Sequence, residues 1–286
     1  MKISEIMKNK ETTLSFEVFP PKTWDAYESV KNTTEEIAKL SPDFMSVTYG
    51  AGGGTSKTSA SITENIMKTY GTTVLAHLTC VSSTKEAVRA HLKELKDIGV
   101  ENILALRGDI PKEGLTVQDF RYASELIAEI KQAGDFCIGG ACYPEGHTES
   151  PHQKEDILHL KEKVDMGCDF LTTQMFFDNN ILYNFLYKIR EAGITVPVVA
   201  GIMPVTNGKQ IKRSCELSGT YLPQRFKTIV DRFGENPAAM KQAGIAYATE
   251  QIIDLLANGV NNIHVYTMNK PDVAAKIQEN LSEILV

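Results

Sequence analysis

Eight short apolar segments recur along the chain, and each is followed by a longer polar stretch in which apolar residues return with helical spacing. This alternation is typical of repeated βα units. The centres of the first seven segments lie roughly 30 residues apart, the length that a strand, a helix and their connections require. The predicted strands cover residues 14–19, 44–49, 73–80, 102–107, 136–142, 170–177, 196–203 and 262–267.

Eight such units predict an α/β fold, a single (β/α)8 TIM barrel that forms one domain over residues 1–286. The last interval holds roughly sixty residues, enough for two or three extra helices between strands seven and eight, one of them beginning near Pro223. The alternative is a doubly wound open sheet. That fold usually carries a glycine fingerprint in its first βα turn, whereas residues 20–23 read PPKT. We therefore predict the barrel.

The composition excludes several classes of protein. With 36 acidic against 30 basic residues and no basic cluster, nucleic acid is not an expected partner. The N-terminus lacks the apolar core of a signal peptide and no apolar run could span a bilayer, so we expect a cytoplasmic protein without a membrane partner. The five cysteines lack CxxC spacing and clustered metal ligands, which predicts reduced thiols and no metal site. The GxSxG motif of serine hydrolases is absent.

Polar residues at the ends of the predicted strands are the candidates for chemistry, because barrel enzymes act at that end. Glu17 alternates onto the same face as Ser15. Burial would raise the pKa of its carboxyl towards neutrality, as a general acid requires, unless a structural Arg or Lys pairs with it. The other candidates are Thr48, Tyr49, His77, Arg107, Asp109, Tyr143, His147 and Gln174. Such a set predicts a pocket for a large heteroaromatic ligand.

The predicted helix after the fifth strand carries a polar stripe. Asp156, His159 and Lys163 share one face at positions i, i+3 and i+7, while Ile157 and Leu160 mark the face expected to be buried. The spacing alone is equally typical of a solvated surface with weak ion pairs, so it assigns no function to the stripe.

Eight motifs in the same order resemble those of the methylenetetrahydrofolate reductases: SFEVFPPKT, VTYGAGGGTS, AHLTC, LALRGD, ACYPEGH, LTTQMFFD, GIMPVTN and HVYTMN. The resemblance runs from about residue 12 to residue 270, nearly the whole chain. The resemblance implies a catalytic barrel that binds FAD without a Rossmann fingerprint. It implies ping-pong reduction of 5,10-methylenetetrahydrofolate by NADH or NADPH, which gives 5-methyltetrahydrofolate for methionine synthesis. It also implies a homo-oligomer, as is common in this family.

The resemblance further implies the roles of individual residues. Glu17 matches the general acid, and Asp109 matches an aspartate beside the flavin and the pterin, where its charge stabilises a cationic iminium. Thr48 falls beside the nicotinamide. Substrate contacts are implied at Asp109, Gln174, Gln210 and Lys270. Cofactor contacts are implied at Thr48, Tyr49, Ala51, His77, Arg107, Gly108, Asp109, Ala123, Tyr143, His147, Asp156, His159 and Lys163.

The chain departs from the family pattern at three positions. His159 stands where an asparagine is common, Lys270 where an arginine is common, and Ser214 near a phenylalanine that stacks on the nicotinamide and the folate. Tyr221 and Phe226 are the nearest aromatic residues. Two alternatives therefore stay open. One is a flavin- or folate-binding subunit that needs a partner as electron donor, and the other is a different folate-binding barrel such as a methyltransferase domain.

Overall fold

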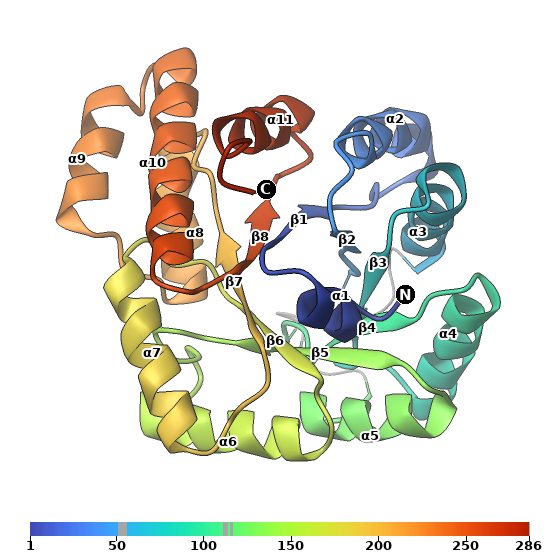
Figure 1. The fold of residues 1–286 in the computed structure, drawn as a ribbon. Helices are drawn as coiled ribbons and strands as arrows, with labels where there is room; N and C mark the ends of the chain where they lie inside the picture. The colour runs from blue at the N-terminus through green and yellow to red at the C-terminus, as the bar shows by residue number, and fades with distance from the viewer. Residues whose placement is uncertain (51–55, 111–113, 115–116, 286) are drawn as a thin grey trace.

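Eight parallel strands form a closed barrel in sequential order, and β8 pairs with β1 to complete it (Figure 1). The structure is a computed structural model that describes residues 1–50, 56–110, 114 and 117–285. The strands are Thr13–Val18 (β1), Phe44–Val47 (β2), Val74–Thr79 (β3), Asn102–Leu106 (β4), Cys137–Cys142 (β5), Phe170–Thr173 (β6), Val198–Ile202 (β7) and Asn262–Tyr266 (β8). Each overlaps one predicted segment, and the TIM barrel is confirmed.

Helices surround the barrel, as Figure 1 shows. Those that follow the first six strands are Tyr27–Ala38 (α2), Ser56–Tyr70 (α3), Lys85–Asp97 (α4), Ala123–Ala133 (α5), Gln153–Asp165 (α6) and Asn179–Glu191 (α7). Between β7 and β8 lie Gly208–Ser218 (α8), Gln224–Phe233 (α9) and Pro237–Ala257 (α10), and Pro271–Asn280 (α11) follows β8. The predicted extra helices are thus confirmed, and α9 begins directly after Pro223.

A short helix that the sequence pattern did not predict, Ile3–Asn9 (α1), covers the N-terminal end of the barrel (Figure 1). Its Ile3 and Ile6 are buried against the apolar side chains of the barrel interior. The Asn102 side chain fixes the segment, because its Oδ1 accepts from Ile3 N at 2.7 Å and its Nδ2 donates to Met1 O at 3.0 Å. This end is therefore filled, and the opposite end is left for ligands.

The barrel interior changes from apolar to polar along the strands. The layer nearest α1 contains Phe44, Leu75, Leu104, Cys137, Phe170 and Val199. Because side chains alternate with a period of two, the residues two positions further along three of these strands face inward as well. They are Ser46, His77 and Thr172, and all three are buried. Polar side chains therefore face the interior towards the C-terminal ends of the strands, where barrel enzymes carry their active sites.

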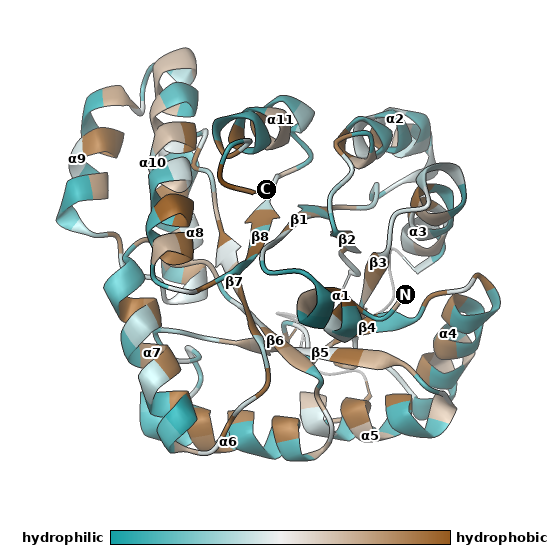
Figure 2. Cartoon of the chain, viewed as in Figure 1, coloured by the Kyte–Doolittle hydropathy of each residue, from teal (hydrophilic) through white to brown (hydrophobic). Residues whose placement is uncertain are grey.

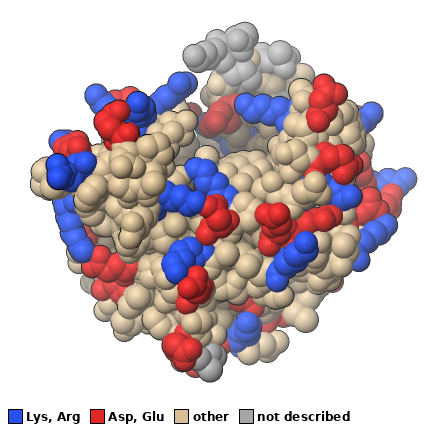
Figure 3. Space-filling view, turned by 90° about the horizontal axis from the view of Figure 1, so that it is seen from above, with Lys and Arg blue, Asp and Glu red and all other residues tan. Residues whose placement is uncertain are grey.

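The outer layer follows the expected amphipathic pattern. In Figure 2 apolar residues run along the strands, whereas apolar and polar segments alternate on the helices. On α6 the predicted buried residues Ile157 and Leu160 are 7% and 2% exposed. Lys, Arg, Asp and Glu side chains are interspersed over the face shown in Figure 3. None of the helices in the described part of the chain is long and apolar enough to cross a bilayer.

Candidate active site

A buried carboxyl, that of Glu17 on β1, lies inside the barrel and is only 8% exposed. Its register neighbour on β2 is Ser46, whose side chain acts to lower the pKa of the carboxyl. Its other close neighbour is His77 on β3, with 3.7 Å between His77 Nε2 and Glu17 Oε2. The basic group that approaches this carboxyl is thus the His77 imidazole. No arginine or lysine of the described residues lies within 4.0 Å of it.

Burial sets the protonation states at this point. It raises the pKa of Glu17 to about 8, against the opposing effect of the Ser46 hydrogen bond. Burial also lowers the pKa of His77 to about 4. Both groups are therefore neutral at pH 7, and their contact is not an ion pair. A carboxyl that keeps its proton at neutral pH has the property required of a general acid.

The last strand adds a tyrosine to the same interior. Tyr266 Oη donates to the Thr173 carbonyl oxygen across the barrel at 2.5 Å. Burial raises the Tyr266 pKa well above its ordinary value, and the nearby Glu17 adds to the effect. This arrangement needs a glycine at position 201 on β7, because a Cβ on Gly201 would collide with both Tyr266 Oη and Thr173 O.

The connection from β8 to α11 clamps the end of β1. Thr267 Oγ1 donates to the Glu17 carbonyl oxygen at 2.6 Å. Asn269 Oδ1 accepts from Phe19 N at 2.8 Å, and its Nδ2 donates to Phe19 O at 3.0 Å. Met268 and Asn269 form this turn in the left-handed region, with φ of 55° and 52°. These residues belong to the sequence motif HVYTMN, in which the sequence alone gives them no role.

A second group of predicted residues lies at the end of β4. Arg107 holds the carboxylate of Glu149 in a two-pronged pair, with both N–O distances at 2.6 Å. Gly108 has a φ of +87°, and a Cβ there would come within 2.8 Å of Val81 Cγ1, so the position requires glycine. Asp109 follows as an exposed residue. The Arg107 guanidinium group can thus bind an anion beside a closely packed backbone turn.

The end of β5 and one face of α6 continue this group. Lys163 Nζ donates to the Ala141 carbonyl oxygen at 2.6 Å, and burial lowers the Lys163 pKa. The rings of Tyr143 and His147 meet edge to face, with centroids 4.6 Å apart. Asp156 acts electrostatically on both Tyr143 and Lys163. The structure therefore brings together the strand-end residues and two members of the polar stripe.

The third member of the stripe lies apart from the other two. The His159 side chain is 54% exposed, and its ring stacks on Tyr122 with centroids 6.4 Å apart. Tyr122 directly precedes Ala123, the first residue of α5. The stripe is thus divided, because Asp156 and Lys163 face the end of β5 while His159 faces the start of α5.

Other predicted residues occupy different parts of the rim. Thr48 is half-buried after β2, where its carbonyl oxygen accepts from Ser59 Oγ at 3.1 Å. The Tyr49 ring contacts His91 on α4 at 4.9 Å between centroids, which turns this side chain towards the helices. Gln174 Oε1 accepts from the next backbone N–H at 2.9 Å. Ala51 lies outside the described residues.

The side of the rim formed by β7 and β8 carries the remaining two predicted residues. Gln210 is exposed in the first turn of α8, and Ser214 Oγ donates to its carbonyl oxygen at 3.1 Å. Lys270 occupies the N-cap position of α11, and its Nζ hydrogen-bonds to Thr206 Oγ1. Burial lowers the Lys270 pKa, with a smaller contribution from Lys241.

The two aromatic residues near Ser214 differ in accessibility. Phe226 is 1% exposed, because it packs between Phe177 and Tyr247 with centroid distances of 5.1 and 4.1 Å. Tyr221 is 55% exposed, and its backbone N–H donates to Glu145 Oε2 at 2.8 Å. Of the two, Tyr221 is the one whose ring is open to a ligand.

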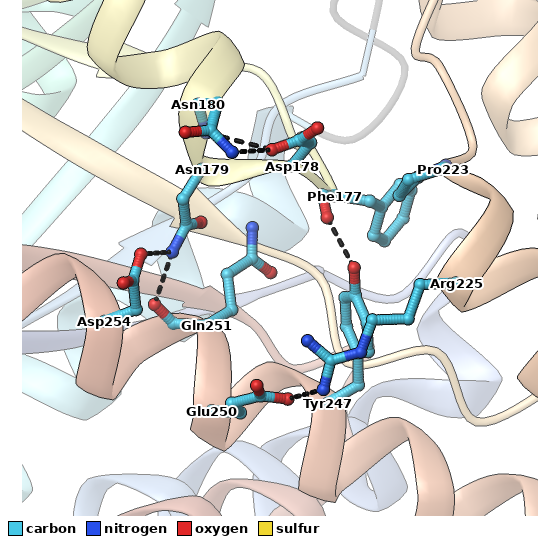
Figure 4. Close-up of a pocket in the computed structure, with 10 residues that line it drawn as sticks. All are labelled: Phe177, Asp178, Asn179, Asn180, Pro223, Arg225, Tyr247, Glu250, Gln251 and Asp254. Carbon is cyan, nitrogen blue, oxygen red and sulfur yellow. Dashed lines mark hydrogen bonds and ion pairs between the residues drawn. The ribbon is translucent and has the colours of Figure 1, made fainter.

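A cleft of about 350 Å³ lies outside the barrel, where the start of α7 meets α9 and α10 (Figure 4). Several of its polar groups pair with one another. Arg225 pairs with Glu250, Asn179 Nδ2 donates to Asp254 at 2.6 Å, and Tyr247 Oη donates to the Phe177 carbonyl oxygen. Since no predicted site residue lines this cleft, the candidate site is the C-terminal end of the barrel.

Comparison with known proteins identifies the family of the chain. The profile of the methylenetetrahydrofolate reductase family matches residues 2–282. The 5,10-methylenetetrahydrofolate reductase of Pectobacterium carotovorum subsp. carotovorum is 34% identical over 268 residues, which cover 94% of this chain and 89% of that protein. The protein of the same name from Escherichia coli (strain K12) is 33% identical over 271 residues, which cover 95% and 91%.

A solved structure supports the fold. It is that of a protein from Clostridium thermocellum that binds two copies of 5-methyl-5,6,7,8-tetrahydrofolic acid. The TM-score is 0.67 at 16% sequence identity, with 100% of this chain and 99% of that chain covered. The resemblance stated from the motifs is thus confirmed. The chain belongs to the methylenetetrahydrofolate reductase family of oxidoreductases.

Proposed function

We propose that the chain reduces 5,10-methylenetetrahydrofolate to 5-methyltetrahydrofolate with NADH or NADPH, that FAD is its bound cofactor, and that Glu17 is the general acid. The observation that carries the proposal is the buried Glu17 carboxyl, with a pKa of about 8, in a barrel of this family. An acid of that pKa is protonated at pH 7 and still able to release its proton in a reaction.

The residues at the ends of β4 and β5 fit a cofactor that carries both rings and a pyrophosphate. Arg107 already holds a carboxylate in a two-pronged pair, and a phosphate group can take the same place on the fork. Lys163 supplies a second positive group at the end of β5, and Arg107 and Asp156 act electrostatically on the Tyr143 side chain. Bound FAD would supply the two-electron carrier between the nicotinamide and the folate.

Glu17 would act on the nitrogen that leaves the folate's five-membered ring. The methylene carbon bridges N5 and N10 in the substrate and remains on N5 in the product, so the proton must go to N10. Donation from Glu17 opens the ring and leaves a cationic iminium at N5. The negative charge of Asp109 would stabilise that cation, while Gln174, Gln210 and Lys270 hold the rest of the substrate.

The nicotinamide and the folate would use the same end of the barrel in turn, which predicts ping-pong kinetics. Thr48 stands at the rim beside β2 for the nicotinamide. Tyr221 is the exposed ring that can stack on a planar substrate in place of the missing phenylalanine.

The Glu17→Gln variant tests the proposal, with the two half-reactions measured separately under anaerobic conditions. We expect reoxidation of the reduced flavin by the folate to slow by about 10²- to 10⁴-fold, the usual contribution of a general acid. Reduction of the flavin by NADH should be nearly unchanged, because that step needs no proton from Glu17.

Equal loss of both half-reactions would contradict the role of Glu17. A wild-type protein that holds flavin but accepts electrons only from a partner protein would favour the binding-subunit alternative. A colourless protein that does not take up flavin would favour another folate-binding barrel.

A further inference from the structure

The regular pairing of β6 with β7 ends one residue before β6 does. The register between these two strands stops at Thr172, which lies opposite Val199, and it does not include Thr173. On the other side of β6 the pairing continues to the end of the strand, where Thr173 lies opposite Cys142 of β5. The last residue of β6 is therefore held by regular backbone pairing on one side only.

Two side-chain hydrogen bonds replace the missing backbone pairing at Thr173. The Gly201 N–H of β7 donates to Thr173 Oγ1 at 2.9 Å, and Tyr266 Oη of β8 donates to the Thr173 carbonyl oxygen at 2.5 Å. The second bond crosses β7, which lies between β6 and β8. It passes so close to β7 that a Cβ on Gly201 would lie 2.3 Å from Tyr266 Oη. Tyr266 thus ties the end of β6 to β8 across the intervening strand.

The residue that this bond holds in place is Gln174, which directly follows Thr173. Its backbone N–H donates to the Cys142 carbonyl oxygen of β5 at 2.8 Å. The next residue, Met175, is 5% exposed and packs in the apolar cluster beside the extra helices. Gln174 therefore lies between two fixed neighbours, and the Tyr266 hydroxyl fixes the one that precedes it.

The side-chain amide of Gln174 has one possible orientation. Its Oε1 accepts from the Met175 backbone N–H at 2.9 Å, and a backbone N–H can only donate, so the amide atom that faces it is the oxygen. The amide nitrogen lies on the other side of the group and has no hydrogen-bond partner among the described residues. Since Gln174 is only half-buried, its two amide N–H groups are available to a ligand atom that accepts hydrogen bonds.

We propose that Tyr266 is a positioning residue for folate binding, whose hydroxyl holds the end of β6 so that the Gln174 amide presents its N–H groups to an acceptor atom of the folate. This role rests on the proposed function and deepens it, because Tyr266 acts on the substrate through Gln174. The Tyr266 hydroxyl donates its one proton to Thr173 O, so it has none left to donate to the substrate.

Tyr266 has a second neighbour that an experiment must separate from Gln174. Glu17 is its register partner on β1, so a substitution of Tyr266 can also act through the acid. Working in the Glu17→Gln protein removes this route, and it also removes the proton transfer that would let a bound folate react. Tyr266→Phe is the suitable variant, because it keeps the ring that packs against the cluster around Met175 and deletes only the hydroxyl.

A double-mutant cycle between Tyr266 and Gln174 tests the proposal. Binding of 5-methyltetrahydrofolate to the full-length, flavin-loaded Glu17→Gln protein is measured by isothermal titration calorimetry. We expect Tyr266→Phe to raise the Kd about fivefold, the usual net effect of one hydrogen bond. Gln174→Ala should raise the Kd by at least as much. In the Gln174→Ala background, Tyr266→Phe should leave the Kd nearly unchanged, because the group that Tyr266 positions is absent.

Thr267→Val is the matched control. It also deletes a β8-end hydroxyl that donates to a backbone carbonyl oxygen, one residue along the chain from Tyr266. That carbonyl belongs to residue 17 on β1 rather than to Thr173 on β6. Any change that Thr267→Val causes in the Kd should therefore be the same with and without the Gln174 side chain.

Equal weakening by Tyr266→Phe with and without the Gln174 side chain would overturn the proposal, because Tyr266 would then act by another route. An unchanged Kd in Tyr266→Phe would overturn it as well. If Tyr266→Phe fails to fold, Gly201→Ala gives the same test, since its methyl group displaces the same hydroxyl from Thr173 O. A parent protein that holds flavin but binds no folate would instead refute the proposed function, and the role of Tyr266 with it.

A second readout connects Tyr266 to catalysis in the protein with Glu17 intact. Tyr266→Phe should raise the KM for 5,10-methylenetetrahydrofolate, whereas the rate of flavin reduction by NADH should be nearly unchanged, because Gln174 serves the folate and not the nicotinamide. A general structural defect would slow both half-reactions, and such a result would also count against the proposal.

Discussion

The raised pKa of Glu17 makes the stability of the folded protein depend on pH. In the unfolded chain this carboxyl titrates near its ordinary pKa of 4.5, and in the folded protein near 8. The folded-state value is the higher one, so the stabilising contribution is complete below pH 4.5 and is lost as the pH rises towards 8. Glu17→Gln removes this titration and keeps a side chain of nearly the same size and shape.

The two pKa values set the magnitude. Between pH 4.5 and 8 the unfolded chain releases a proton that the folded protein retains, which lowers the free energy of unfolding by about 1.4 kcal/mol for each pH unit. The wild type should therefore lose about 1 kcal/mol by pH 5 and about 3 kcal/mol by pH 7. The advantage of the Glu17→Gln variant should grow by about 2.5 kcal/mol between these two values.

Urea unfolding of the wild type and the variant at pH 5 and pH 7 measures this difference directly. Other titrating groups are common to both proteins and cancel in the comparison. Glu36→Gln, which removes an exposed carboxyl on α2, controls for the loss of a carboxyl as such. If the difference between Glu17→Gln and the wild type were the same at both pH values, Glu17 would not hold its proton in the folded protein, and the acid role would lose its physical basis.

Three further predictions test other parts of the structure. Arg107→Met should weaken flavin retention by about tenfold or more through loss of charge-assisted hydrogen bonds, and Glu149→Gln should strengthen it by freeing the fork; flavin content after dialysis measures both. Gly201→Ala should cost about 1–3 kcal/mol in urea unfolding, because the new methyl group collides with Tyr266 and Thr173; an unchanged midpoint would contradict the close approach. Tyr221→Ala should raise the KM for NADH or the folate severalfold, and unchanged steady-state kinetics would remove Tyr221 from the site.

The order and number of strands follow from the sequence because each βα unit is encoded locally. Alternation also predicts that Ser15 and Glu17 share one face, and both side chains are buried inside the barrel. The predicted segment 170–177 exceeds β6, which ends at Thr173. The sequence continues with apolar residues there, but Met175 and Phe177 pack outside the sheet with the extra helices.

The features that the sequence could not predict depend on contacts between distant segments. The closure by α1 joins Ile3 to Asn102, and the clamp on β1 joins Phe19 to Asn269. Hydrogen bonds inside the barrel likewise join Ser15 on β1 and Ser46 on β2 to His264 on β8, which is 218 residues from Ser46. A single sequence predicts that His264 and Tyr266 lie on the same face of their strand. It cannot show which side chains on other strands they contact.

The most direct test of the central claim is an anaerobic titration of the purified wild-type protein, followed through its visible spectrum. NADH is added first and 5,10-methylenetetrahydrofolate second. The proposed function predicts a yellow protein that NADH bleaches and that the folate recolours with formation of 5-methyltetrahydrofolate. A bleached protein whose colour the folate does not restore would contradict the claim that this barrel reduces 5,10-methylenetetrahydrofolate.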